Sequence, residues 1–253
     1  VPVDVKVLGN AKHTIPMITA LLEERKRSEW NAEFEPDAQE EYEKVIEKEL
    51  YPMNGSLKMG EVVRKVSEAT GNDAVLVTDV GQNQMMGVRY FKYKRTRSVV
   101  TSGGLGTMGF GLPAAVGAQV ARPNDTVICI SGDGSFMMNV QELGTVKRKQ
   151  LPLKIVLLDN QRLGMVRQWQ QLFFQERYSE TTLTDNPDFL MLASAFGIPG
   201  QHITRKDQVE AALDTMLNSD GPYLLHVSID ELENVWPLVP PGASNSEMLE
   251  KLS

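Results

Sequence analysis

The sequence contains only one cysteine, Cys129, and three scattered histidines. A disulfide framework and a thiolate zinc site are therefore excluded, and the lone cysteine favours a reducing compartment, so we expect a cytoplasmic location. Basic residues are also few, because 26 Lys and Arg oppose 33 Asp and Glu and the net charge is −7. This balance argues against nucleic acid as the main partner. No apolar run is long enough to span a membrane, so we expect no membrane partner.

Several catalytic signatures are missing as well. There is no G-x-S-x-G elbow and no H-E-x-x-H helix, so hydrolase and zinc-protease functions lack support. His226, in the apolar run LLHVSI, is interpreted as a core or strand-end histidine. The chain has no initiator Met and opens in mid-pattern at Val1, so we expect it to be a fragment of a longer polypeptide.

What the sequence does contain is organised around residues 126–160. An apolar run ends at Gly132-Asp133-Gly134-Ser135, a helix-like segment follows, and a second apolar run ends at Asp159-Asn160. Both runs are short, rich in Ile, Val and Leu and bounded by turn residues, which predicts buried parallel strands. Ligands of such sheets bind at the carboxyl ends of the strands.

The residues at these two ends predict a specific chemistry. A strand, a crossover helix and a second strand bring Asp133 and Asn160 side by side. One carboxylate and one amide oxygen suit Mg²⁺, whose remaining ligands are usually phosphate oxygens and water. The Gly-Asp-Gly-Ser turn leaves backbone N–H groups at a helix N-terminus, where anions bind. Together these features predict a metal-bridged diphosphate; the ordinary alternative is an Asp-Gly turn near a strand-end Asn.

Strands and helices alternate along most of the chain, which predicts an α/β protein with a doubly wound parallel sheet. Residues 1–30 combine a strand-like start with an amphipathic helix, too little to bury a core, so we expect the tail of another domain. Residues 31–55 are expected to be an acidic linker, residues 56–235 the diphosphate- and metal-binding domain, and residues 236–253 a C-terminal tail. In the main domain the expected strands are 74–79, 98–101, the run before Gly132, 154–159 and 223–229, and the expected helices are 57–70, 137–149, 161–174, 187–196 and 206–218.

A competing motif lies in the same domain. Residues 104–109 read G-L-G-T-M-G and satisfy the dinucleotide fingerprint G-x-G-x-x-G after a strand and before a helix. That fingerprint also predicts an acidic residue about 20 positions on, and Asp133 follows Gly109 by 24, so the spacing does not decide. An acid that binds ribose does not need glycines on both sides, which are typical of a phosphate-binding turn. Asp133 lies within Gly-Asp-Gly, and this favours a metal-bound diphosphate.

Twenty-five residues separate Gly134 from Asn160. This spacing resembles the thiamine-diphosphate motif, in which Gly-Asp-Gly precedes Asn-Asn by some two dozen residues, although Asp159 replaces the first Asn here. Further stretches resemble the C-terminal portion of the acetohydroxyacid synthase (acetolactate synthase) large catalytic subunit: DVGQNQM at 79–85, SGGLGTMGFGLPAA at 102–115, LGMVRQWQQLFF at 163–174 and the tail WPLVPPGASN. The resemblance covers residues 56–253, and residues 1–30 resemble the end of the family's central domain.

The resemblance implies a thiamine-diphosphate-binding fold and roles for individual residues. The implied cofactor-binding residues are Gln82, Gly106, Met108, Gly132, Asp133, Gly134, Ser135 and Asn160. The implied Mg²⁺ ligands are Asp133, Asn160 and the backbone carbonyl of Arg162. The implied catalytic residues are Met108, which would hold the cofactor bent, and Met165 and Trp169, which would line the substrate pocket. Asn83 stands where relatives often carry His, so we assign it no role.

The resemblance further implies decarboxylation of pyruvate and carboligation to a second 2-oxoacid, pyruvate or 2-oxobutyrate, in branched-chain amino-acid biosynthesis. It implies FAD in a non-redox role mostly outside this chain, a homodimer or tetramer with the active site at the interface, and a small regulatory subunit. The glutamate that activates the cofactor belongs to a pyrimidine-binding domain that no stretch here resembles, so we expect this chain to be inactive alone. The alternatives are another thiamine enzyme (an oxoacid decarboxylase or pyruvate oxidase) and a cofactor-binding module without activity.

Overall fold

The computed structural model of the protein describes residues 2–250. Val1 of the expected N-terminal segment and residues 251–253 of the expected tail therefore lie outside the described residues. The chain divides into two compact units, Val1–Tyr42 and Glu43–Ser253, and each is described by itself.

The first unit is helical. Its helices are α1 (Ala11–Thr19), α2 (Ser28–Ala32) and α3 (Glu35–Glu41). The expected strand at the start of the chain is wrong, because residues 2–10 are irregular. An extended segment needs a neighbouring strand to satisfy its backbone groups, and the described part of this unit contains none.

The second unit begins inside the region that we expected to be a linker. A π-helical turn at Tyr42–Ile46 leads into α4 (Glu47–Leu50). Glu49 and Leu50 are buried, and Leu50 belongs to the main hydrophobic core. These residues therefore pack with the larger unit, whereas the other predicted boundaries remain predictions.

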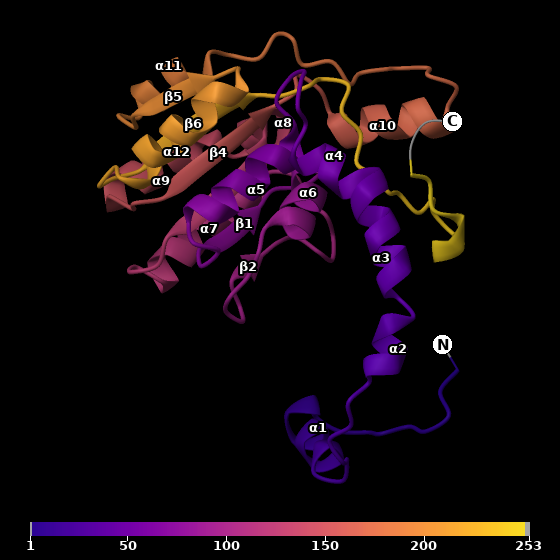
Figure 1. The fold of residues 1–253 in the computed structure, drawn as a ribbon. Coiled ribbons are helices and arrows are strands. Elements are labelled where there is room, and N and C mark those ends of the chain that lie inside the picture. The colour runs from indigo at the N-terminus through magenta and orange to yellow at the C-terminus, as the bar shows by residue number, and fades with distance from the viewer. Residues whose placement is uncertain (1, 251–253) are drawn as a thin grey trace. The chain divides into compact units, whose positions relative to one another are not determined.

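The larger unit is built on one sheet of six parallel strands in the order β2-β1-β3-β4-β6-β5 (Figure 1). This confirms the predicted α/β class and the predicted parallel sheet. The strands are β1 (Val75–Thr78), β2 (Val99–Val100), β3 (Val127–Gly132), β4 (Lys154–Asp159), β5 (Gly200–Ile203) and β6 (Tyr223–Ser228).

Alternate strand residues face opposite sides of the sheet, and each side is covered by helices. Side chains such as Ile128, Ile130 and Val156 share one core with α5 (Met59–Ala69), α6 (Gln82–Tyr90) and α12 (Val209–Leu217). Side chains such as Val127, Cys129 and Ile155 share the second core with α7 (Gly111–Ala121), α9 (Leu143–Lys149) and α11 (Phe189–Ala195). Strands buried on both faces explain the continuous apolar runs in the sequence.

The helix α6 and the strand β5 are among the elements that escaped prediction. The helix α6 begins with polar residues and contains Gly87, whose Cβ, if present, would lie 2.9 Å from the Thr78 side chain of β1. Glycine at position 87 allows this close approach, but it weakens the helical signal from which α6 could have been predicted in the sequence. The strand β5 reads GQHI and lies at the edge of the sheet, where polar residues are tolerated, so it has no apolar run.

Two predicted helices have different bounds. The helix expected at 137–149 is α8 (Asp133–Met138), a 3₁₀ turn at Val140–Glu142 and then α9. The break falls at Asn139, whose side chain donates a hydrogen bond to the carbonyl of Gly109 at 2.7 Å. The helix expected at 161–174 is α10 (Gly164–Phe173), because Arg162 instead forms an antiparallel bridge with Thr182.

None of the helices among residues 2–250 has both the length and the apolar character that crossing a bilayer requires.

Candidate functional site

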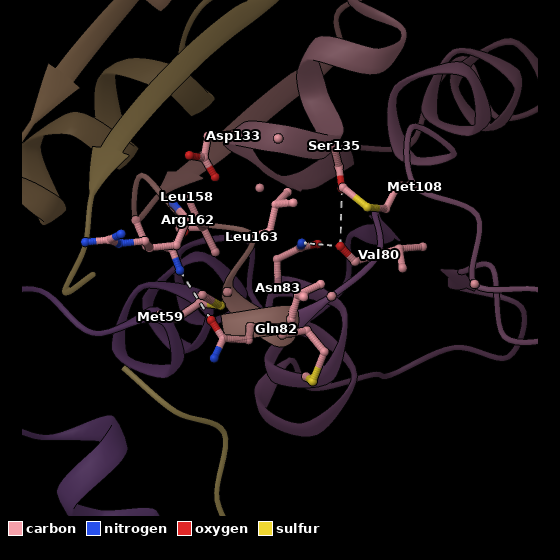
Figure 2. Close-up of a pocket in the computed structure, with 18 residues that line it drawn as sticks. Met59, Val80, Gln82, Asn83, Met108, Asp133, Ser135, Leu158, Arg162 and Leu163 are labelled. Atoms are coloured by element: carbon pink, nitrogen blue, oxygen red, sulfur yellow. Dashed lines mark hydrogen bonds between the residues drawn. The ribbon is translucent and has the colours of Figure 1, made fainter. Parts of the chain in front are cut away.

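A cavity of about 220 Å³ lies where β1, β3 and β4 end at the carboxyl edge of the sheet (Figure 2). Ten of the eleven site residues that we predicted line it, namely Gln82, Gly106, Met108, Gly132, Asp133, Gly134, Ser135, Asn160, Arg162 and Met165. The exception is Trp169. These ten residues come from segments spread over 84 positions of the chain, from Gln82 to Met165, so their convergence is a property of the fold.

The strand register explains why Asp133 and Asn160 lie in one cavity. Gly132 at the end of β3 is paired with Leu158 of β4, so Asp133 and Asn160 follow adjacent strand ends. Both side chains are buried, with 2% and 5% of their surface exposed. The Asn160 side chain donates from Nδ2 to Gln82 Oε1 at 3.3 Å, and its Oδ1 accepts from the backbone N–H of Arg162 at 3.2 Å. The amide is therefore held in one orientation.

The carboxyl of Asp133 sits in an environment that disfavours its negative charge. Burial, and then the neighbouring charge of Asp159, raise the pKa of Asp133 to about 7. Two hydrogen bonds oppose this effect, one donated by Asn186 Nδ2 to Asp133 Oδ2 at 2.8 Å and one from the backbone N–H of Gly134. A cation at this position would supply the missing positive charge and favour the ionised form.

The second carboxyl, Asp159, is balanced differently. Burial alone would raise its pKa, but the hydrogen bond with His226 Nε2 at 2.8 Å and the backbone N–H of Gln161 bring the pKa of Asp159 below its usual value. The His226 ring in turn stacks on His202, with 4.1 Å between the ring centroids. His226 is buried in the interior of β6, so of the two interpretations, core or strand end, the core histidine is confirmed; its partner is the acid that replaces the motif's first Asn.

The loop that carries Gly106 and Met108 is fixed by Asp79, which is fully buried after β1. One carboxylate oxygen accepts from the Gly109 N–H at 2.9 Å and the other from the Gly111 N–H at 3.0 Å. A Cβ on Gly111 would lie 2.8 Å from this carboxylate, so the approach requires glycine. The sequence flagged Asp79 only as a strand-end residue, without this role.

Three observations bear on what the cavity could hold. A Cβ on Gly134 would lie 2.9 Å from the Leu163 side chain, so glycine allows Leu163 to pack against the first turn of α8. Asn83 is 4% exposed and its Oδ1 is buried without a hydrogen-bond partner at the cavity wall; this oxygen needs a donor, which an amino group of a cofactor would supply and a diphosphate would not. Among residues 2–250 no three His, Cys, Asp or Glu side chains could hold a metal together, so a cation here would depend on one carboxylate plus neutral oxygens, as Mg²⁺ does.

The two predicted substrate-pocket residues occupy different positions on α10. Met165 lines the cavity, whereas Trp169 lies one turn further along and donates from Nε1 to Met165 Sδ at 3.1 Å. Trp169 lines a second cavity with Val166, Gln170, Phe174 and Arg177, and Val166 also lines the first. The two cavities are therefore neighbours along α10, and Trp169 reaches the first one only through Met165 and Val166.

Comparison with known proteins identifies the family of this site. A family profile described as "Thiamine pyrophosphate enzyme, C-terminal TPP binding domain" matches residues 79–227, more than half of the chain. The chain is 84% identical over 192 residues to the acetolactate synthase isozyme 2 large subunit of Escherichia coli (strain K12), covering 76% of this chain and 35% of that protein. It is 47% identical over 201 residues to the acetolactate synthase large subunit of Pyropia yezoensis, covering 79% and 34%. The chain thus spans about a third of the length of these relatives.

A solved structure agrees with the sequence comparisons. It is a thiamine diphosphate-dependent 4-hydroxybenzoylformate decarboxylase of Rhodococcus jostii RHA1, with a TM-score of 0.65 and 25% identity, covering 72% of this chain and 35% of that one. The dinucleotide alternative for residues 104–109 is therefore wrong, since these residues lie within the match to a TPP-binding domain. The chain belongs to the thiamine pyrophosphate enzymes, as their C-terminal TPP-binding domain, and is similar to the C-terminal portion of acetolactate synthase large subunits.

Proposed function

We propose that this chain is the diphosphate- and Mg²⁺-binding part of an acetolactate synthase, which decarboxylates pyruvate and joins the remaining two-carbon unit to a second 2-oxoacid. The observation that carries the proposal is the convergence of ten motif residues on one cavity. The similarity to acetolactate synthase large subunits supports the choice of reaction.

The metal would be held by Asp133, Asn160 and the backbone carbonyl of Arg162. Asp133 contributes the charge that the ion needs, and Gln82 fixes the Asn160 amide so that its oxygen is the atom left for the metal. The N–H groups of Gly134 and Ser135 would bind the diphosphate, with Gly132 keeping the backbone accessible. The bound cofactor supplies an electron sink for the carbon–carbon bond that breaks.

The remaining cavity residues would shape the reaction space. Gly106 would bind the aminopyrimidine through its backbone, and Met108 would support the bent cofactor. Asp79 holds their loop through the Gly109 and Gly111 N–H groups. Met165 presents an apolar wall that excludes water. Trp169, which contacts Met165, would help to select the second substrate by its size.

The wider assembly follows from the relatives and is also proposed. The substrates would be pyruvate and 2-oxobutyrate, and FAD would bind mostly outside this chain. A homodimer or tetramer would complete the active site at its interface, and a small regulatory subunit would associate with it. The buried Cys129, the only cysteine, accords with a cytoplasmic location; burial raises the pKa of its thiol and keeps it unreactive.

A product assay with the full-length protein tests the proposal. Pyruvate, thiamine diphosphate and Mg²⁺ should yield acetolactate, and addition of 2-oxobutyrate should yield acetohydroxybutyrate. The second candidate is a 2-oxoacid decarboxylase, which the structural similarity to a decarboxylase favours. Release of free aldehyde without acetolactate would select that candidate, and no turnover of any 2-oxoacid would leave only a cofactor-binding module.

A further inference from the structure

The loop that follows β6 joins three elements of the cavity wall through one residue, Glu233. Its carboxylate accepts from the Met59 N–H at the start of α5, at 2.9 and 3.2 Å. Its backbone carbonyl accepts from Gln82 Nε2 at 2.9 Å and from Arg167 Nη2 at 2.8 Å. Glu233 is therefore bonded to α5, α6 and α10, although it does not line the cavity itself.

The contact to Gln82 leads directly to the proposed metal site. Gln82 donates to the Glu233 carbonyl with its Nε2 and accepts from Asn160 Nδ2 with its Oε1. A Cβ on Gly164 would collide with Gln82 Oε1 and lie 2.7 Å from Asn160 Nδ2, so this chain of contacts is tightly packed. A shift of the Glu233 carbonyl would therefore turn the Gln82 amide and, with it, the Asn160 oxygen.

The Glu233 side chain is held by a second acid. Glu49 of α4 is 7% exposed, accepts from the Gly60 N–H at 3.3 Å and pairs with Lys58 at 3.2 Å. Glu233 accepts from the Met59 N–H and Glu49 from the next N–H along, that of Gly60, so the two buried carboxyls lie together at the start of α5, and a proton held between them would let one donate to the other. Two buried carboxylates in contact would otherwise repel.

The surrounding charges do not remove this need for a proton. Lys58 is the cation nearest to the pair, its side chain is 35% exposed, and it is bonded to Glu49. On neighbouring elements, Lys206 pairs with Glu61 at 3.4 Å, and Arg167 contacts the carbonyl of Glu233. Burial first, and then the hydrogen bond to Glu49, raise the pKa of Glu233 well above its usual value.

We infer that Glu233 is a positioning residue for the metal- and diphosphate-binding residues, and that the proton it shares with Glu49 keeps the loop clamped to α5 while its carbonyl orients Gln82 and Asn160. The inference rests on the proposed function. Loss of the shared proton would separate the two carboxylates and loosen the loop, so metal binding should weaken at alkaline pH for a reason that lies outside the metal ligands.

The test compares Glu233→Gln and Glu233→Ala in the full-length protein. Gln keeps the acceptor for Met59 and a donor for Glu49 but does not titrate, whereas Ala removes the clamp. Glu210→Gln is the matched control, because it removes one carboxylate from an exposed ion pair with Lys65. Mn²⁺ affinity in the presence of thiamine diphosphate is measured by electron paramagnetic resonance from neutral to alkaline pH, and folding is checked by thermal unfolding.

At neutral pH Glu233→Ala should weaken Mn²⁺ binding by about tenfold, as expected for a residue that orients a ligand. Glu233→Gln should bind as the wild type does at neutral pH and lose less affinity than the wild type at alkaline pH. A wild-type alkaline decline that persists unchanged in Glu233→Gln would overturn the inference, as would wild-type affinity in a folded Glu233→Ala. Absence of Mn²⁺ binding to the wild type would instead overturn the proposed function.

Discussion

The substitution Asp79→Ala should loosen the loop that carries Gly106 and Met108 while leaving the strands intact. The Asp79 carboxylate is fully buried and accepts hydrogen bonds from the N–H groups of Val80, Gly109 and Gly111 at 2.9–3.0 Å. Alanine removes every one of these acceptors. The Gly109 and Gly111 N–H groups would then be left buried near the cofactor cavity with nothing to accept from them.

The magnitude follows from the number of donors left without a partner. A buried unsatisfied donor costs about 1–3 kcal/mol, so two of them cost roughly 2–6 kcal/mol of the free energy of unfolding. Entry of water into the space left by the carboxylate brings the expected value to about 3 kcal/mol. Asp79→Asn keeps one acceptor oxygen and presents an amide donor to the other N–H group, so it should cost about half as much.

Urea unfolding measures the stability, and calorimetric titration with thiamine diphosphate and Mg²⁺ measures the effect on the loop. We expect the order wild type, Asp79→Asn, Asp79→Ala in both measurements, with affinity falling about tenfold in the alanine variant if the loop is displaced. An unfolding free energy within about 0.5 kcal/mol of the wild type in Asp79→Ala would refute the reasoning, because surface substitutions produce changes of that size.

Four further predictions follow from the site and its surroundings. Asp133→Ala should abolish Mg²⁺-dependent binding of thiamine diphosphate in a calorimetric titration, because it removes the one charged protein ligand. Trp169→Leu should lower the ratio of acetohydroxybutyrate to acetolactate when pyruvate and 2-oxobutyrate compete, since a pocket discriminates one methylene by about 1–3 kcal/mol. Gly164→Ala should displace Gln82 and weaken cofactor binding, with the change visible in a crystal structure of the variant. Burial raises the pKa of Tyr93 to about 12, so stability should fall as pH rises from about 10, the unfolded value, through that folded value. Tyr93→Phe should lack this loss, which we expect to be only about 1 kcal/mol because the side chain is 38% exposed and solvent reduces the effect.

Each of these has a control or an opposing outcome. Unchanged cofactor affinity in Asp133→Ala would remove the metal assignment, and Asp185→Ala, an acid outside the cavity lining, should bind normally. A wild-type product ratio in Trp169→Leu would make the indole a packing residue only. Gly117→Ala is the control for Gly164→Ala, since a Cβ on Gly117 would meet no atom within 4 Å. Equal alkaline unfolding curves for Tyr93→Phe and the wild type would contradict the assignment to this phenol.

Much of the site was predictable because its chemistry is encoded locally. The apolar runs before Asp133 and Asn160 identified two parallel strands. When two parallel strands are neighbours in a sheet, their carboxyl ends lie side by side at the same edge. The glycine turn and the two oxygen-bearing side chains then predicted a metal-bound diphosphate without any knowledge of tertiary contacts. The same locality explains the correct sheet class, since burial on both faces leaves a direct trace in the composition of each strand.

The residues that hold the site in place were decided only by the tertiary structure. Glu233 lies 151 positions from Gln82, and Glu49 lies 184 from Glu233, so no spacing in the chain relates them. Asp79 looked like any acid at a strand end until Gly109 and Gly111 were seen to donate to it. Trp169 shows the converse: the resemblance placed it in the substrate pocket with Met165, but four residues along α10 its ring lines the neighbouring cavity instead. Local pattern determines which elements form and which atoms can bind a metal, whereas the orientation of those atoms depends on hydrogen bonds between distant segments, which only folding brings within reach.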